Sequence, residues 1–182
     1  MRQLPLAIGP VAEPSFDNHL PGPNTAARAQ LLALADALAG PPGLPAPLYL
    51  WGPAGSGKTH LLRALVQRLQ SRGHAAAWFE AATPQPWHWA PEWRLVVIDD
   101  CDQLDEAAQQ AAFALFVEAA AHGTQLVTAG RLPPVDLPLR EDLKSRLAWG
   151  LVLALQPLGD AETRAVLRRQ ADERGLLLPD EV

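Results

Sequence analysis

The feature that most constrains this chain is a glycine-rich stretch between an apolar run and an amphipathic pattern. The apolar residues 48–51 lead into the spacing G-x-x-x-x-G-K-T, and leucines at helical spacing follow over residues 61–69. A strand, a glycine-rich turn and a helix N-terminus in this order are typical of a phosphate-binding loop, or P-loop. The candidate nucleotide-binding residues of this stretch are Gly52, Pro53, Ala54, Gly55, Ser56, Gly57, Lys58, Thr59 and His60.

Each part of the P-loop pattern has a chemical role. Glycine tolerates positive φ, so successive backbone N–H groups can point into one concavity. A helix that begins near Lys58 adds the positive end of its dipole. Lys58 can reach the outer phosphates, and the hydroxyl of Thr59 can ligate Mg²⁺. We therefore expect ATP or ADP with Mg²⁺ as the ligand; the alternative is an ordinary glycine-rich turn.

A second informative site follows the apolar run 95–98, which reads as a strand buried on both faces. Asp99 and Asp100 come at its end, where ligands bind in open α/β sheets. Asp99 is suited to hold Mg²⁺ through water, and Asp100 to orient or deprotonate an attacking water. The alternative is a strand end before an acidic helix start. Together with a P-loop upstream, the pattern favours a Walker B site.

Charge and composition bound the class of protein. The 182 residues contain 15 Lys and Arg against 20 Asp and Glu, a net charge of −5, so we do not expect direct DNA binding over a broad surface. Cys101 is the single cysteine, which excludes an intrachain disulfide and fits a reducing compartment. Residues 1–11 lack a signal-peptide pattern and no apolar run could span a bilayer, so we expect a cytoplasmic protein without a membrane partner.

Strand-like and helix-like segments alternate along the chain, which predicts an α/β fold with a mainly parallel five-stranded sheet flanked by helices. Asn24 or Thr25 is expected to cap the first helix. Residues 83–93 hold three tryptophans between prolines; we expect them to fold back onto the body, with a protein contact or base stacking as the alternative. The expected strands are 48–51, 75–79, 95–98, 124–130 and a last, buried one at 151–155. The expected helices follow residues 24, 57, 104, 139 and 159, and another begins near 178.

The motifs in order resemble the AAA+ P-loop ATPases, and within them the DnaA/Hda family, over residues 15–182. This resemblance implies a tail at 1–14, an AAA+ nucleotide-binding domain at 15–156 and a partial helical lid at 157–182. The matching motifs are Phe16-Asp17-Asn18 with Gly22 and Asn24, Trp51-Gly52, Val97-Ile98-Asp99-Asp100, Pro133-Pro134 and Leu143-Lys144-Ser145-Arg146-Leu147-Ala148-Trp149-Gly150.

The family resemblance also implies partners. Gln3, Leu4 and Leu6 are similar to the peptide by which the shorter Hda branch binds the DNA polymerase III sliding clamp. Arg146 matches the family's arginine finger, which acts in trans on a neighbour's nucleotide. We therefore expect a clamp-bound activator of DnaA ATP hydrolysis, a negative regulator of replication initiation. The alternative for Arg146 is a surface salt bridge to Glu141 or Asp142.

Two departures from the family pattern shape these expectations. The family's aspartate after the fourth strand is absent, which leaves Thr128 as the polar candidate for a nucleotide contact. No residue matches the lid's later arginine, so we expect weak intrinsic ATP hydrolysis and action mainly through a partner ATPase. A DnaA-like initiator or helicase-loader module that binds DNA, a small-molecule kinase and a homodimer stay open as alternatives.

Overall fold

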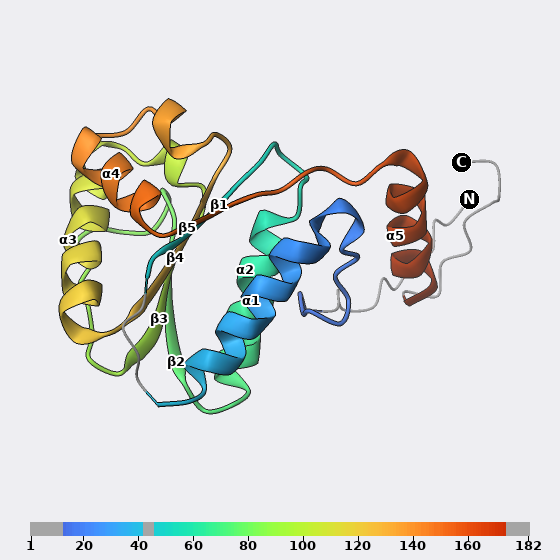
Figure 1. The fold of residues 1–182 in the computed structure, drawn as a ribbon, viewed down its shortest axis with the longest axis horizontal. Coiled ribbons are helices and arrows are strands. Elements are labelled where there is room, and N and C mark those ends of the chain that lie inside the picture. Colours follow the sequence, from blue (N-terminus) through green and yellow to red (C-terminus); the bar gives the residue numbers. More distant parts are fainter. Residues whose placement is uncertain (1–12, 42–45, 174–182) are drawn as a thin grey trace, which may run out of the picture.

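The computed structural model describes residues 13–41 and 46–173, which form a five-stranded sheet with helices on both faces (Figure 1). The strands are β1 (Leu48–Trp51), β2 (Ala75–Phe79), β3 (Trp93–Ile98), β4 (Gln125–Gly130) and β5 (Leu151–Ala154). The α-helices are α1 (Thr25–Leu38), α2 (Lys58–Gln70), α3 (Glu106–His122), α4 (Glu141–Trp149) and α5 (Asp160–Glu173). Short 3-10 helices span Gly22–Asn24, Cys101–Gln103 and Pro134–Asp136.

The strands are all parallel and lie in the order β2-β3-β4-β1-β5, which confirms the predicted α/β architecture. Because β4 lies between β1 and β3, the register places Trp51 beside Gly130 and Ile98 beside Thr128. The carboxyl ends of these three strands therefore meet at one edge of the sheet. The P-loop follows β1 and the two aspartates follow β3, so the fold brings both motifs to that edge.

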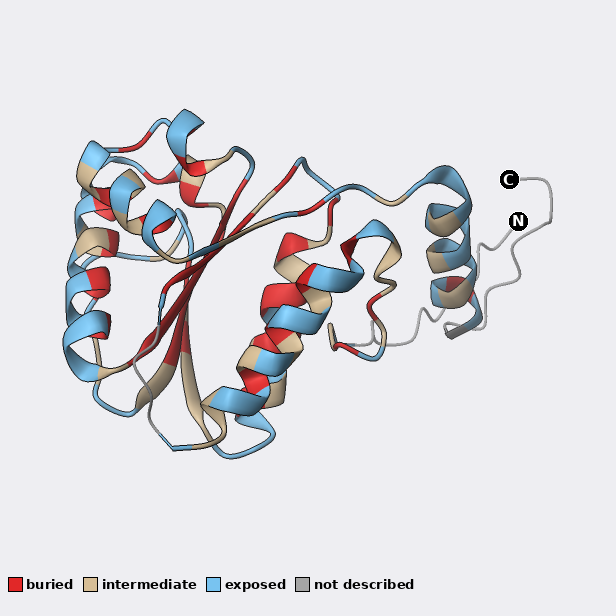
Figure 2. Cartoon of the chain, viewed as in Figure 1, coloured by how far each residue is buried: buried red, intermediate tan, exposed pale blue. Residues whose placement is uncertain are grey.

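Two apolar layers hold the sheet between its helices, and the buried residues gather in the strands and on the inner faces of the helices (Figure 2). Alternate side chains of β3 pack in the two layers, because successive residues of a strand point to opposite faces of the sheet. Leu95 and Val97 pack in the layer that includes α1 and α2, whereas Val96 and Ile98 pack in the layer that includes α3 and α4. This double burial explains the unbroken apolar run of β3.

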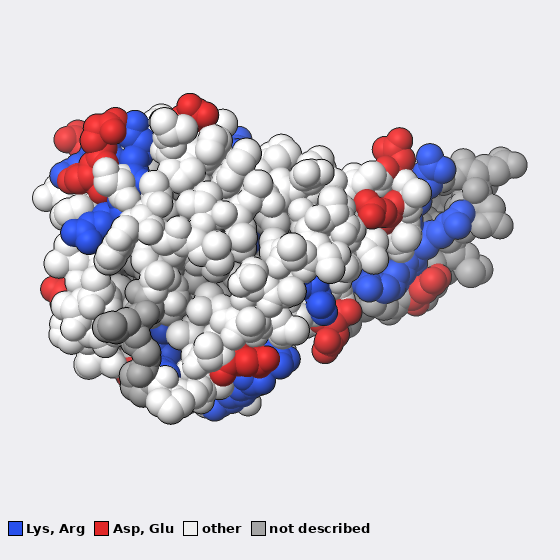
Figure 3. Space-filling model, viewed as in Figure 1, with Lys and Arg blue, Asp and Glu red and all other residues white. Residues whose placement is uncertain are grey.

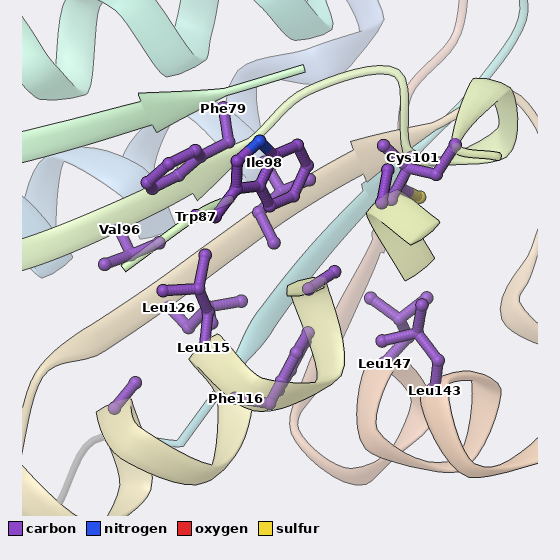
Figure 4. Packing of buried hydrophobic residues seen from close by; sticks show 14 of the residues in the cluster. Phe79, Trp87, Val96, Ile98, Cys101, Leu115, Phe116, Leu126, Leu143 and Leu147 are labelled. Atoms are coloured by element: carbon purple, nitrogen blue, oxygen red, sulfur yellow. The ribbon is translucent and has the colours of Figure 1, made fainter. Parts of the chain in front are cut away.

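The layer beside α3 and α4 also contains the tryptophan loop (Figure 4). Trp87 is buried, and its ring lies 4.8 Å from that of Phe79. The Trp89 ring stacks on His122 at 4.0 Å, and its Nε1 donates to the hydroxyl of Thr124. The expectation that these tryptophans fold onto the body is confirmed.

Two local predictions were wrong. The last strand is not buried: among the strands of the described ranges β5 pairs only with β1, at the edge of the sheet, and Leu151 is 43% exposed. Asn24 occupies the N-cap position of α1, but its side chain makes no capping hydrogen bond. The amide of Asn24 is bonded elsewhere, to Ser56 and Gln156, and the hydroxyl of Thr25 donates to the carbonyl of Gly22 instead.

Helix α5 lies to one side of the sheet, next to the segment that precedes α1 (Figure 1). Arg169 of α5 donates a hydrogen bond to the carbonyl of Asn18. The partial helical lid at 157–182 and the domain boundaries at 14 and 156 stay predictions. The helix expected near 178, and the residues Gln3, Leu4 and Leu6, lie outside the described residues.

Charged side chains gather on one face of the molecule over α4, along α5 and near the ends of α1 and α2, with a broad uncharged band between them (Figure 3). Acidic and basic side chains are mixed in these groups, and a row of basic side chains runs along α5. In the described ranges, none of the helices combines the length and hydropathy that a membrane crossing requires.

Candidate nucleotide site

The glycine-rich loop has a backbone that other residues could not easily adopt. Gly55 and Gly57 have φ angles of 79° and 92°, in the left-handed region that favours glycine. Glycine is required at position 52 for a different reason, because a Cβ there would clash with the carbonyl of Leu155. The loop can therefore pass close to the end of β5 and then reverse into α2.

The N-terminus of α2 presents free amides to this loop. The amide of Leu61 donates to the carbonyl of Gly57 at 3.0 Å. The amides of Lys58, Thr59 and His60 precede this bond, and at a helix N-terminus such amides have no intrahelical acceptor. Together with the helix dipole they favour an anion at this point.

Lys58 is held beneath the loop. Its Nζ donates to the carbonyls of Gly52 at 2.7 Å and Pro53 at 3.0 Å, and the residue is 6% exposed. Burial lowers the pKa of Lys58, while the charges of Asp100 and Asp99 oppose that shift. The ammonium group is thus held by carbonyls of the loop itself.

Thr59 and Asp99 form a direct link between the P-loop and β3. The hydroxyl of Thr59 donates to Oδ2 of Asp99 at 2.7 Å, and Asp99 is 2% exposed. Burial is the main reason that the pKa of Asp99 is raised, and the charge of Asp100 adds to it, whereas the bond from Thr59 opposes it. A cation next to Asp99 would offset this cost of burying the carboxylate.

These donors fit a magnesium ion. Hydroxyl and carboxylate oxygens are ligands that Mg²⁺ prefers, and Mg²⁺ is usually bound by one or two protein groups together with water and phosphate oxygens. Among the residues that the structure describes, no cluster of three or more His, Cys, Asp or Glu could hold a metal alone. Thr59 and Asp99 would therefore hold the ion jointly with a nucleotide.

A cavity of about 350 Å³ opens beside the amides at the start of α2. Asp100, in a left-handed conformation with φ 46°, also lines it. Six of the predicted P-loop residues, Asp100 and one unpredicted arginine meet here, whereas Gly52, Pro53, Ser56 and Asp99 do not line this cavity. The cavity is lined by Ala54, Gly55, Gly57, Lys58, Thr59, His60, Asp100 and Arg131.

A smaller cavity of about 120 Å³ adjoins the first, since both are lined by Gly55, Gly57 and His60. It lies between the segment before α1, the P-loop and α5. The rings of His19 and His60 are 5.2 Å apart, and Nε2 of His60 lies 3.0 Å from the carbonyl of Ser15. Burial lowers the pKa of His19 to about 4, and burial lowers that of His60 as well.

Asn24 connects three segments around the smaller cavity. Its Nδ2 donates to the carbonyls of Gln156 at 2.8 Å and Ser56 at 3.4 Å, and its Oδ1 accepts from the amide of Gln156. Asn24 is 4% exposed, so these bonds are made away from water. The asparagine therefore joins the segment before α1 to both the P-loop and the chain that leads into α5.

The comparisons with known proteins agree with this geometry. Residues 12–78 match the family model described as the bacterial DnaA ATPase domain. Domain III of DnaA from Thermotoga maritima superposes with a TM-score of 0.79 at 23% identity, over 96% of this chain and 80% of that one. AMPPCP-bound DnaA from Aquifex aeolicus gives 0.74 at 21% identity, over 97% and 59%. A DnaA bound to AMPPCP and single-stranded DNA gives 0.72 at 21% identity, over 96% and 59%.

The chain has the fold of a DnaA-like AAA+ ATPase domain. It spans about three fifths of the length of the two longer DnaA chains. The shared fold does not show that this chain has the activity of those longer proteins.

Arg146 lies in this AAA+ fold on α4, away from the P-loop helix. Its Cζ sits 5.8 Å from the ring centre of Phe113 on α3. Among the described residues, Glu141 pairs with Lys144 and Asp142 pairs with Arg140, so the expected alternative of a salt bridge from Arg146 is not what the structure shows.

The structure differs from the sequence prediction at three residues of the site. Thr128 is 1% exposed and is not among the residues that line either cavity, so its contact with a nucleotide stays a prediction. His19 and Arg131 line the cavities but were not predicted to do so. The position of Arg131 directly after a strand of the same parallel sheet was the signal that could have identified it.

Proposed function

We propose that this chain is an adenine-nucleotide-binding AAA+ regulator that, bound to the DNA sliding clamp, stimulates hydrolysis of the ATP held by DnaA. The observation that carries the nucleotide part is the bond between Thr59, which lines the P-loop cavity, and the buried Asp99. It joins the candidate magnesium ligands next to free helix amides and a buried lysine. Two of the DnaA structures with this fold contain AMPPCP, an ATP analogue, which supports the same ligand here.

The position of Arg146 supports action in trans. Its neighbour Phe113 belongs to α3, which packs on the sheet face opposite to α2, the helix that follows the P-loop. The guanidinium is partly exposed and makes no ion pair within the described ranges. An arginine on this face is therefore available to a nucleotide bound by a neighbouring molecule, where it would stabilise charge on the transferred phosphoryl group.

The clamp part of the proposal depends on Gln3, Leu4 and Leu6, whose side chains match a clamp-binding peptide in type and order. A short peptide that precedes the folded domain can bind a partner without a change in the AAA+ site. Regulation of DnaA would follow from bringing Arg146 close to DnaA on DNA that carries the clamp.

The test is the rate of ATP hydrolysis by DnaA in the presence of DNA-loaded clamp. The unaltered protein should stimulate hydrolysis, and Arg146→Ala should lose the effect by a factor of about 100 or more. Arg140→Ala is the matched control, because Arg140 lies over the same Phe113 ring at 6.0 Å and should leave stimulation nearly unchanged. Equal stimulation by the Arg146 variant and the unaltered protein would remove this mechanism. Gln3→Ala should weaken clamp binding without a change in nucleotide binding.

A second candidate function is a DnaA-like initiator or helicase-loader module that binds DNA directly. It is favoured by the fold shared with the DnaA that was solved with single-stranded DNA. The net charge of −5 and the mixed charges of Figure 3 disfavour it. Fluorescence anisotropy with labelled single- and double-stranded DNA, without clamp and at about 150 mM salt, separates the two candidates. Tight binding under these conditions would favour the second.

A further inference from the structure

A cavity of about 450 Å³ lies at the end of the sheet opposite to the P-loop. The strand residues that line it stand at amino ends: Leu48 begins β1, Gln125 begins β4 and Leu151 begins β5. Because the strands are parallel, these amino ends are remote from the carboxyl ends where the P-loop and the two aspartates follow. Among the described residues, this cavity shares no lining residue with the two cavities beside the P-loop. It is therefore a separate candidate site.

Most of the described residues around this cavity are apolar. Helix α1 forms one wall, and the first residues of β1 and β5 lie across from it. The volume falls within the range of roughly 300–1,000 Å³ that is typical of small-molecule sites. The apolar lining residues include Ala33, Leu34, Ala37, Leu38, Leu48 and Leu151. These walls favour a ligand with an apolar body.

Arg94 of β3 is the one charged residue that lines the cavity in the part of the chain that the structure describes. Its Nη2 donates to the carbonyl of Leu38 at 3.0 Å and to that of Gly40 at 2.7 Å, at the C-terminal end of α1. A guanidinium group has five N–H donors, and these two bonds use only one of its three nitrogens. The Nε of Arg94 is buried without a hydrogen-bond partner. Arg94 therefore has donors to spare.

No carboxylate of the described ranges forms an ion pair with Arg94. The carbonyls at the end of α1 orient the guanidinium group, but they carry only partial negative charge. An arginine that is fixed in this way at an apolar cavity lacks a full counter-charge. A carboxylate is the group that matches a guanidinium group best in charge and shape.

Gln125 fixes the strand ends beside Arg94. It pairs in register with Leu95, the residue that follows Arg94 in β3. Its Nε2 donates to the carbonyls of Ala46 at 2.7 Å and Leu126 at 2.9 Å, and the residue is 3% exposed. The amide is thus bonded to the backbone, which leaves Arg94 as the group that would recognise a charged ligand.

We propose that this cavity binds a small monocarboxylate with an apolar body, whose carboxylate pairs with Arg94 while the apolar part packs against α1. The site is independent of the proposed nucleotide site, because it lies at the other end of the sheet. Its ligand class follows from one cation without a counter-ion at the wall of an apolar cavity.

Titration of the full chain with 4-phenylbutanoate, and with its neutral counterpart 4-phenylbutan-1-ol, tests the charge preference. Chemical-shift changes in nuclear magnetic resonance spectra give both dissociation constants. The carboxylate should bind with a constant of about 1 mM or tighter, and about tenfold more tightly than the alcohol. Arg94→Met should abolish this preference, and Arg94→Lys should recover part of it. Arg63→Met is the matched control, because Arg63 lines a different cavity beside Trp78 and its loss should change neither constant.

A second pair of variants tests the cavity without a change at Arg94. Ala37→Leu fills part of the cavity, so it should weaken both probes about tenfold. Ala29→Leu makes the same change at an exposed position of α1 that does not line the cavity, and it should weaken neither.

Three results would overturn the proposal. The first is that the unaltered protein binds neither probe, and the second is that it binds both equally. The third is that Arg94→Met weakens both probes alike, since this is the result expected if Arg94 only holds the end of α1. None of these results bears on nucleotide binding, which is measured separately.

Discussion

The hydroxyl of Thr59 donates a hydrogen bond of 2.7 Å to Oδ2 of Asp99, a residue 40 positions further along the chain. Because β1, β4 and β3 are parallel neighbours, the turn after β1 and the end of β3 lie at the same edge of the sheet, where this bond can form. It couples the P-loop to the carboxylate that would face a magnesium ion. The functional proposal follows from this pair more than from either motif alone.

The first prediction concerns the hydroxyl of Thr59. Thr59→Val keeps the branched shape but removes the magnesium ligand, so MgATP affinity should fall about tenfold or more, whereas ATP affinity in EDTA should change little. Thr59→Ser is the control that retains the hydroxyl and should behave like the unaltered protein. Titration calorimetry with and without Mg²⁺ measures both. An equal loss in the two conditions would speak against a magnesium ligand at this position.

The second prediction concerns Asn24. Asn24→Ala would leave the carbonyl of Ser56 and the backbone of Gln156 without their buried partner. The free energy of unfolding in urea should fall by about 2–3 kcal/mol. The neighbouring Thr25→Ala, at an exposed hydroxyl, should cost less than about 0.5 kcal/mol. Similar losses for both variants would show that Asn24 does not join the three segments.

The third prediction concerns pH and His19. The folded protein holds His19 neutral to about pH 4, whereas the unfolded chain takes up the proton near 6.5. The unfolded state therefore binds more protons as the pH falls below 6.5, and this destabilises the fold by about 2 kcal/mol between pH 7.5 and 5. His19→Phe should remove that part of the pH dependence.

The exposed His88→Gln is the control for this experiment and should leave the pH dependence of unfolding unchanged. Urea denaturation at several pH values provides the measurement. If the profiles of His19→Phe and the unaltered protein run parallel from pH 7.5 to 5, burial does not hold His19 neutral.

The fourth prediction concerns Gly130. Gly130→Ala places a Cβ against the hydroxyl of Tyr49 and Sγ of Cys101, so the free energy of unfolding should fall by about 1–3 kcal/mol. Gly159→Ala meets its nearest atom, an oxygen of Glu162, at an ordinary 3.6 Å and should change stability by no more than about 0.5 kcal/mol. Thermal unfolding followed by circular dichroism compares them. An equally stable Gly130 variant would show that the turn after β4 has room to spare.

Local patterns in the sequence were enough to predict the sheet and the P-loop. The apolar residues before Gly52 and before Asp99 are typical of buried strands, and the leucines after Lys58 have helical spacing. Glycine at 55 and 57 is required by backbone geometry, so the positive φ angles could be foreseen. The sequence predicted Thr59 and Asp99 as ligands of one magnesium ion; the direct hydrogen bond between them was not predicted.

Other features depend on contacts that are distant in sequence. Asn24 looked like a helix cap because capping is a local property, yet its amide is taken by Gln156, 132 positions away. The apolar residues of β5 suggested burial, but strand order makes β5 an edge. Burial of His19 and the pairing of Arg131 with Asp102 likewise result from segments that meet only in the folded chain.

The most direct test of the account is a calorimetric titration of MgATP into the unaltered protein and into Lys58→Met, which keeps the stem of the side chain but removes the buried ammonium. The unaltered protein should bind the nucleotide at one site. The variant should lose affinity by about 100-fold while its circular dichroism spectrum is unchanged. Absence of binding by the unaltered protein, or equal binding by both, would contradict the claim that the P-loop binds a nucleotide.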